Sequence, residues 1–272
     1  MTTLHPSTLS DAELATYHDQ GYVRLGHVAP AAEIEAMCQR IDDIMLGKIS
    51  YDNMLMQLCP SAGNPELSKQ TSEFKGSTLK YRKIQDLEQD PLFLAYMQNP
   101  LFGDLTRKII GARVSIFRAM FFNKPAEQGV LINWHQDGAG GWGLDIPPKI
   151  TVWTALDSTR IENGCLQIIP GSHKSKIPQT GDLLSEQERA IHASDDKRLY
   201  LELAAGEVVL LHNWTLHRSE TNQTNRPRRA FSVCYIDAAT RQNNTGRDFP
   251  QIFPNYAAAQ YDAQAQKTSA AY

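Results

Sequence analysis

Apolar residues recur at helical spacing in the first part of the chain. The clearest stripe predicts an amphipathic helix over residues 30–46, with Pro30 in the first turn, where proline is tolerated. Its members are Ile34, Met37, Cys38, Ile41, Ile44 and Met45. Ser10 and Glu13 form a capping-box pattern, which predicts a further helix that Gly21 ends. This capped helix covers residues 11–19, and two more helices are expected over residues 91–98 and 100–110.

The pattern changes after Gly111 to short runs of β-branched and aromatic residues separated by turn residues. Several short strands without long helices between them favour a sandwich or a barrel, and we expect a jelly roll. Together with a short early strand at 22–25, the expected strands cover residues 113–123, 130–137, 149–157, 165–169, 207–212 and 228–237. The fold class predicted is therefore mainly β with added α, a jelly-roll core backed by N-terminal helices.

The same texture suggests how the chain is organised. We expect one domain over residues 1–272, with a helical part to about 111, a jelly-roll core over about 112–240 and a tail after it. Residues 48–80 are polar and irregular, as functional loops often are, and are interpreted as a lid. Residues 256–272 are rich in Ala and Gln without an apolar stripe, so we expect a frayed or loosely helical tail.

Composition narrows the class of protein. The 27 basic and 30 acidic residues leave a formal charge of −3, which disfavours a nucleic-acid partner. No apolar run approaches the roughly 20 residues that span a bilayer, and no basic-then-apolar leader opens the chain. We therefore expect no membrane partner and a cytoplasmic location. The cysteines at 38, 59, 165 and 234 lie far apart and are expected to be reduced packing residues. The oligomeric state is not predicted.

The most informative segment is Asn133-Trp-His-Gln-Asp137. On a strand, residues two apart share a face, so His135 and Asp137 can meet at one metal ion. A single such pair is weak support, because the pattern recurs by chance. A second segment, residues 210–230, supplies His217 and, at the start of the next strand, Arg228. Two histidines and one carboxylate form the facial triad of non-haem Fe(II) sites, which leaves three coordination positions open.

The open positions and Arg228 together suggest a cosubstrate. A 2-oxo acid can take two positions and O2 the third, while a guanidinium deeper in the barrel clamps the far carboxylate of 2-oxoglutarate. Two assignments compete with rival residues. His212 could be the ligand instead of His217, but an odd separation puts the two on opposite faces of an extended strand. Arg229 alternates with Arg228, so only one of them can point into the barrel.

From about Lys80 to Asp237 the sequence resembles the phytanoyl-CoA dioxygenase family of Fe(II)/2-oxoglutarate-dependent oxygenases. The motifs that carry the resemblance are LKYRKIQD, MFFNKP, WHQD, TVWTALD, ENGCLQIIPGSHK and LHNWTLHRSETNQTNRPRRAFSVCY. The resemblance implies a double-stranded β-helix fold and the cofactors Fe(II), 2-oxoglutarate and O2. It assigns the iron triad to His135, Asp137 and His217 and the distal carboxylate to Arg228.

The resemblance also implies cosubstrate contacts for Lys83, Met120, Gln136, Trp153 and Ser219. Plainer interpretations exist for four of them. Lys83 can equally be a solvated lysine, and Met120 and Trp153 are of types more often found as plain core residues. Gln136 must face away from the side chains of its neighbours if the strand is regular. The glycine-rich loop 138–143 is expected to be a flap that brings Trp142 near the substrate.

The activity expected is hydroxylation of an unactivated C–H bond in a small metabolite, with 2-oxoglutarate converted to succinate and CO2. Asp137 occupies the position that is a small residue in halogenating relatives, so halogenation is disfavoured. Two alternatives stay open: a catalytically silent metal-binding jelly roll, and a zinc-dependent hydrolase that uses the same triad. The hydrolase also needs a poised general base, and the sequence singles none out. The primary substrate is not predicted.

Overall fold

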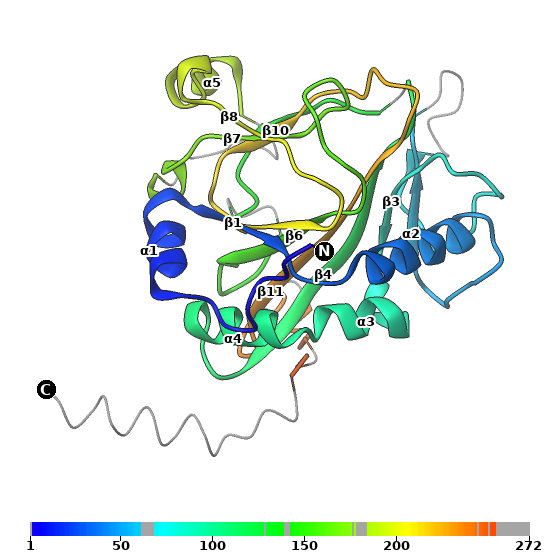
Figure 1. Cartoon of the computed structure of the whole chain (residues 1–272), viewed down its shortest axis with the longest axis horizontal. Coiled ribbons are helices and arrows are strands. Elements are labelled where there is room, and N and C mark those ends of the chain that lie inside the picture. The colour runs from blue at the N-terminus through cyan, green and yellow to red at the C-terminus, as the bar shows by residue number, and fades with distance from the viewer. Residues whose placement is uncertain are drawn as a thin grey trace, which may run out of the picture.

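Two antiparallel β-sheets form the centre of the molecule (Figure 1). The computed structural model describes residues 2–60, 68–127, 129–138, 142–175, 177, 184–243, 245–249 and 251–253. Within these residues the larger sheet has seven strands, in the order β1 (Tyr22–His27), β9 (Glu207–His212), β6 (Ile150–Ala155), β11 (Arg228–Asp237), β4 (Val114–Lys124), β3 (Tyr81–Gln85) and β2 (Leu55–Leu58). The smaller sheet has four, in the order β5 (Ile132–His135), β10 (His217–Ser219), β7 (Leu166–Ile168) and β8 (Leu199–Leu201).

The helices are mostly those predicted from the sequence. They are α1 (Asp11–Gln20), α2 (Ala31–Met45), α3 (Pro91–Met97), α4 (Pro100–Ile109) and α5 (Glu186–His192), with short 3-10 turns at Leu87–Gln89, Ser172–Lys174 and Asp195–Lys197. Both bonds of the capping box between Ser10 and Glu13 are present, and Gly21 ends α1 with φ of 74°. A Cβ on Gly21 would lie 2.4 Å from side-chain atoms of His173 and Thr215, so only glycine fits there. None of the described helices is long and apolar enough to cross a bilayer.

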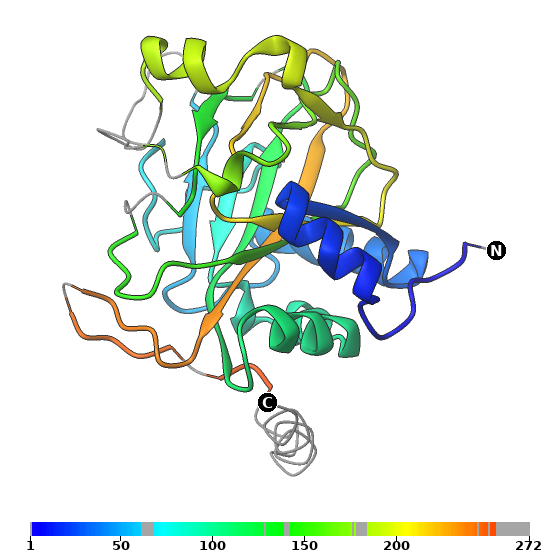
Figure 2. The same ribbon diagram turned by 90° about the vertical axis from the view of Figure 1, so that its left-hand side faces the viewer.

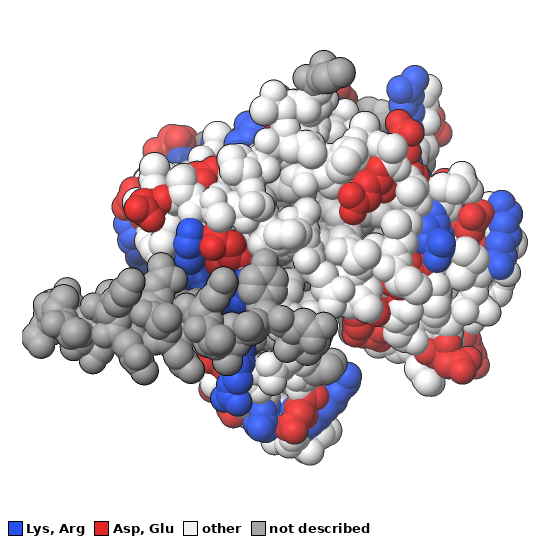
Figure 3. Space-filling model, turned by 60° about the horizontal axis from the view of Figure 1, so that its bottom comes forward, with Lys and Arg blue, Asp and Glu red and all other residues white. Residues whose placement is uncertain are grey.

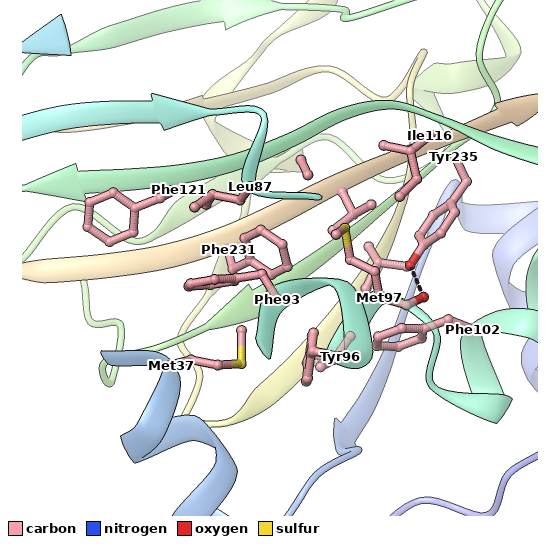
Figure 4. Packing of buried hydrophobic residues seen from close by; sticks show 14 of the residues in the cluster. Met37, Leu87, Phe93, Tyr96, Met97, Phe102, Ile116, Phe121, Phe231 and Tyr235 are labelled. Atoms are coloured by element: carbon pink, nitrogen blue, oxygen red, sulfur yellow. Dashed lines mark hydrogen bonds between the residues drawn. The ribbon is translucent and has the colours of Figure 1, made fainter. Parts of the chain in front are cut away.

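One face of the larger sheet is covered by helices and carries the main core (Figures 1 and 4). Along β11 the odd-numbered residues Phe231, Val233 and Tyr235 enter this core, against helices α2, α3 and α4. The hydroxyl of Tyr235 donates to the Met97 carbonyl at 2.8 Å and so ties α3 to the sheet. The even-numbered residues of β11 must point to the opposite face, because side chains alternate along a strand.

That opposite face looks toward the smaller sheet, and Figure 2 shows the two sheets and the supporting helices from the side. The mainly β fold class expected from the sequence is confirmed by this arrangement. The four cysteines are free, as expected, and three of them are buried.

Some sequence-based expectations differ from the structure. Residues 48–80 are not wholly irregular, because β2 lies among them and pairs with β3, which was not predicted as a strand. Residues 61–67 of the expected lid, and the expected tail at 256–272, lie outside the described residues. Helix α5 was also not predicted, although Ser185 and Glu188 form a capping box before it.

Candidate metal centre and its pocket

His135, Asp137 and His217 come together at one end of the smaller sheet. His135 and His217 are directly opposite each other on the neighbouring strands β5 and β10, and their ring centroids are 4.1 Å apart. Strand β5 ends at His135, and the chain beyond it brings Asp137 to both rings. The Asp137 carboxylate oxygens lie 3.6 Å from Nε2 of His135 and 3.9 Å from Nε2 of His217. One ligand atom from each residue lies within 4.8 Å of the others.

The hydrogen bonds of the two histidines use Nδ1 of each ring and leave Nε2 available to a metal ion. Nδ1 of His135 donates to the Asn133 carbonyl at 2.8 Å, and Nδ1 of His217 donates to the Thr215 carbonyl at 2.9 Å. The Nε2 lone pairs therefore face Asp137, in the tautomer that a metal ligand needs. Burial, together with the neighbouring His217, lowers the pKa of His135 to about 4, so this ring is neutral at pH 7. The donor set fits an Fe(II) ion.

The triad opens onto a pocket of about 230 Å³ lined by both sheets. The larger sheet supplies the floor in cross-strand rows, because even-numbered residues of β4 and β11 share one face. At one end Lys124 is opposite Arg228, and in the middle Met120 is opposite Ser232, which is in turn opposite Trp153. At the other end Arg118 is opposite Cys234, which is opposite Thr151. All of these side chains line the pocket.

Arg228 is a buried cation whose hydrogen-bond donors are only partly used. It is 3% exposed, and one terminal nitrogen donates to the Gly164 carbonyl at 2.8 Å. Its Nε has no partner among the described residues. Burial lowers the pKa of Arg228 to about 10, yet leaves it charged at neutral pH. A buried guanidinium with an unpaired donor is suited to a carboxylate ligand.

Lys124 lies beside Arg228 and was not singled out from the sequence. Its ammonium donates to the Val130 carbonyl at 2.6 Å and lies 3.5 Å from the Ser219 carbonyl. Burial and the charge of Arg228 lower the pKa of Lys124 to about 7. Ser219, two residues after His217 on β10, lines the pocket between the triad and these two cations.

Of the remaining predicted contacts, Lys83, Met120 and Trp153 line the pocket, whereas Gln136 does not. Gln136 is 3% exposed, and its amide group binds backbone instead. The amide nitrogen donates to the carbonyls of Ser175 and Trp214, and the amide oxygen accepts from the Ile177 amide at 3.2 Å. The side chain of Gln136 is therefore held by backbone groups outside the pocket, and the structure does not support its expected cosubstrate contact.

His212 and Arg229, the alternatives to His217 and Arg228, do not occupy the positions of those two residues. His212 ends β9 in the larger sheet, and its ring lies 5.0 Å from that of His173. It lines the pocket but does not join the cluster of the three ligand atoms. Arg229 points to the other side of the sheet, where it binds Asp157 through two nitrogens and Asp42 at 3.0 Å.

Sequence reasoning missed several polar pocket residues, among them Arg118 and Asn213. Arg118 could have been found, because it is two residues before Met120 on the same strand face. Asn213 lies in the turn between β9 and β10, which has no periodicity to follow. Trp142, from the expected flap, lines the pocket, and the centre of its ring lies 5.1 Å from that of Phe117. Residues 139–141 lie outside the described part of the chain.

Comparison with known proteins identifies the family of this chain. The family model of phytanoyl-CoA dioxygenase (PhyH) matches residues 17–230. A probable phytanoyl-CoA dioxygenase of Caenorhabditis elegans is 28% identical over 249 residues, which cover 86% of this chain and 78% of the relative. The peroxisomal phytanoyl-CoA dioxygenase of Homo sapiens is 22% identical over 246 residues, covering 87% of this chain and 71% of the relative.

Solved structures with the same fold are also similar. The crystal structure of EctD from S. alaskensis with bound Fe has a TM-score of 0.70 at 21% identity, covering 89% of this chain and 82% of EctD. The non-heme alpha ketoglutarate dependent carbocyclase SnoK, from nogalamycin biosynthesis, has a TM-score of 0.66 at 21% identity, covering 88% and 89% of the two chains. The expected jelly-roll fold is thereby confirmed. Because the family model spans most of its length, this chain belongs to the phytanoyl-CoA dioxygenase family of Fe(II)/2-oxoglutarate-dependent oxygenases.

Proposed function

We propose that this protein hydroxylates an unactivated C–H bond of a small metabolite, with Fe(II) held by His135, Asp137 and His217. The observation that carries the proposal is the convergence of two histidine Nε2 atoms and one carboxylate in a pocket that also contains a buried Arg228. Iron, when bound with 2-oxoglutarate and O2, supplies the oxidising chemistry. Overall, 2-oxoglutarate, O2 and the substrate give succinate, CO2 and the hydroxylated product.

The protein's own residues orient the reactants in this proposal. Arg228 holds the distal carboxylate of 2-oxoglutarate through its donors, with Lys124 and Ser219 beside it. Met120 and Trp153 form the apolar wall along the cosubstrate, which limits the access of water. The carbonyls of Asn133 and Thr215 fix the histidine rings, so the ligand atoms need no rearrangement before metal binding.

The two alternatives have less support. A metal-binding protein without catalytic activity has no need for a buried arginine with an unpaired donor at the far end of the pocket. A zinc hydrolase needs a general base near the metal-bound water, and Asp137 is the only acidic residue among the described residues that line the pocket. That carboxylate is already part of the triad.

The experiment that tests the proposal is a metabolite screen with Fe(II), ascorbate and 2-oxoglutarate, scored by succinate release and product mass. We expect basal, iron-dependent succinate formation without a substrate and a marked rise with the right metabolite. The product should be about 16 mass units heavier than the substrate, which is the mass of one oxygen atom. Zinc in place of iron is the control and should give no succinate. Absence of iron-dependent succinate formation from the metal-loaded protein would contradict the proposal.

A further inference from the structure

The pocket has a second cationic end, away from Arg228. Arg118, Cys234 and Thr151 form the last row of the floor, and Arg228 begins the first. The six-residue interval from Arg228 to Cys234 along β11 corresponds to about 20 Å at roughly 3.3 Å per residue. This distance is too long for one five-carbon cosubstrate to fill.

The triad lies between the two ends. On one side, Ser219 follows His217 along β10 and approaches Lys124 at 3.5 Å. On the other side, the amide after Asp137, that of Gly138, donates to the Asn213 carbonyl at 2.7 Å. A cosubstrate that runs from the metal to Arg228 therefore occupies one side only. The side with Arg118 and Asn213 is left for the primary substrate.

Arg118 is positioned to receive an anion. Its guanidinium carbon lies 4.6 Å from the centre of the Phe117 ring and 4.4 Å from that of Trp142. These contacts orient the planar group while it lines the pocket. The charged residues among the described lining residues are Asp137 and six basic ones, namely Arg82, Lys83, Arg118, Lys124, Arg218 and Arg228. Arg218 is paired with Glu220 at 3.0 Å. A cosubstrate held at the Arg228 end does not extend to Arg118, which lines the part of the pocket left for the primary substrate.

Asn213 adds a hydrogen-bond acceptor at the same end. It is 2% exposed and lines the pocket, and its amide nitrogen donates to Thr151 Oγ1 at 3.0 Å and to Cys234 Sγ at 3.7 Å. Its amide oxygen has no donor among the described residues. Buried polar atoms are nearly always paired in working proteins, so this oxygen indicates a ligand with an N–H or O–H group.

We propose that the primary substrate is a small organic anion whose carboxylate or phosphate pairs with Arg118 and which donates an N–H or O–H to Asn213. This inference rests on the proposed function, because it takes the Arg228 end to be filled by 2-oxoglutarate. The C–H bond that reacts then lies between the anionic group and the triad. Binding the charged end of the substrate at Arg118 fixes which carbon faces the metal.

The test is a library of matched pairs, in which each carboxylic acid is offered with its primary amide and each phosphate monoester with its alcohol. Stimulated succinate release is measured with Fe(II) and 2-oxoglutarate, and binding is measured by calorimetry without O2, where no turnover occurs. We expect the anionic member of the active pairs to be preferred by at least tenfold in both measurements. Carboxylate pairs and phosphate pairs distinguish the two sources of the anion. A library without such a preference, including one without active members, overturns the proposal.

Variants locate the preference at Arg118. In Arg118→Gln the KM and the dissociation constant of the anionic member should rise at least tenfold, while those of the neutral partner change less than about twofold. Arg118→Lys should recover part of the affinity, since it keeps the charge without the fork. Arg113→Gln, at an exposed arginine before the same strand, is the matched control and should leave all constants unchanged. Equal losses for both members of a pair in Arg118→Gln would overturn the assignment.

Failure of this inference can be told from failure of the proposed function. Basal succinate formation by the unaltered protein, measured before any library compound is added, depends on the residues that hold iron and 2-oxoglutarate and needs no anion at Arg118. If that activity is present and no anion is preferred, the Arg118 proposal alone is wrong. If it is absent, the oxygenase assignment of this chain is wrong.

Discussion

At the scale of single residues, the two histidines of the triad are held by backbone carbonyls two positions earlier in the chain. His135 contacts Asn133 and His217 contacts Thr215 in the same way, so both rings present Nε2. His135→Ala and His217→Ala each remove one of three ligands, and we expect each to abolish iron-dependent succinate formation and reduce bound iron at least tenfold. Metal analysis and succinate assays check this. His192→Ala, on helix α5 away from the pocket, is the control; full activity in either triad variant would contradict the assignment.

Adjacent arginines on β11 allow a matched comparison. Arg228 lines the pocket, whereas Arg229 binds Asp157 on the opposite side of the sheet. We expect Arg228→Ala to raise the KM for 2-oxoglutarate about 30-fold or more, because an unpaired buried carboxylate costs roughly 2–5 kcal/mol. Arg229→Ala should lower the melting temperature without a comparable change in that KM. Steady-state kinetics with varied 2-oxoglutarate decide between them, and an unchanged KM in Arg228→Ala would move the role to another cation.

The affinity for 2-oxoglutarate should depend on pH through Lys124. Burial, Arg228 and Arg82 lower the pKa of this ammonium to about 7, and Glu220 and Cys59 oppose them. An anionic ligand favours the protonated form, so affinity should be highest below pH 7 and fall by up to about tenfold per unit above it. Calorimetry from about pH 6 to about pH 9, a range that brackets the pKa of Lys124 in the ligand-free protein, measures this dependence. Lys124→Met should flatten the profile, and a slope that survives in this variant would exclude Lys124 as its source.

At the scale of elements, Asp90 joins three segments of the helical layer. Its carboxylate caps α3 through the amides of Leu92 and Phe93, and it also binds Arg40 of α2 at 2.7 Å and Tyr51 at 2.6 Å. We expect Asp90→Ala to lower the free energy of unfolding by about 3 kcal/mol, because it leaves several donors unpaired. Denaturant titration checks this. Ser185→Ala, at the exposed cap of α5, is the comparison and should cost about 1 kcal/mol.

The same contribution should depend on pH in a defined direction. Burial alone would raise the pKa of Asp90, but the hydrogen bonds from Tyr51, Arg40 and the backbone lower it overall. Since the pKa in the folded state is below that in the unfolded state, the stabilisation is present above about pH 4 and is lost as the pH falls. The stability gap between the parent protein and Asp90→Ala should therefore narrow in acid. A stability gap that stays constant down to about pH 3, roughly one unit below the pKa of an unfolded aspartate, would contradict this account.

Local patterns predicted the elements that local chemistry determines. The capping box of Ser10 and Glu13, the stripe on α2 and the long strands of the core all appear near their expected bounds. Strand β2 has only four residues and lies at the sheet edge, so its sequence contains too little alternation to be recognised. Likewise, His135 and Asp137 could be proposed from their spacing, but the packing of Gln136 against a distant loop depends on tertiary contacts.

At the scale of the whole molecule, the larger sheet contributes most of the hydrophobic core, and the smaller sheet contributes the two histidine ligands. Helices cover the outer face of the larger sheet with aromatic and aliphatic side chains, as Figure 4 shows for Phe93 and Tyr96 of α3, which pack against Phe231 of β11. The inner face is thereby left for polar residues such as Arg118 and Arg228, whose desolvation this core must offset. The smaller sheet contributes the metal ligands His135 and His217 on short strands. The pocket therefore lies between the floor formed by the larger sheet and the short strands of the smaller sheet.

The distribution of charge has a consequence for anion binding. The chain has a formal charge of −3, and on the face shown in Figure 3 acidic and basic residues are interspersed without a large area of one sign. Inside the pocket, by contrast, six of the charged residues among the described lining residues are basic and one is acidic. A concave, low-dielectric site with this balance attracts anions over distances comparable to the Debye length. The attraction must work against the net charge of the molecule, so it is local to the pocket.

Salt should therefore weaken the capture of 2-oxoglutarate without slowing the reaction that follows. Between about 0.01 M and 0.15 M ionic strength the Debye length falls from roughly 30 Å to 8 Å, and we expect kcat/KM for 2-oxoglutarate to fall about two- to fivefold. The rate at saturating cosubstrate should not change, because the buried contacts at Arg228 are screened little. Equal effects of potassium chloride and potassium acetate would separate screening from chloride binding at the metal. A kcat/KM that is independent of salt would mean that the pocket cations act only by contact after the ligand has entered.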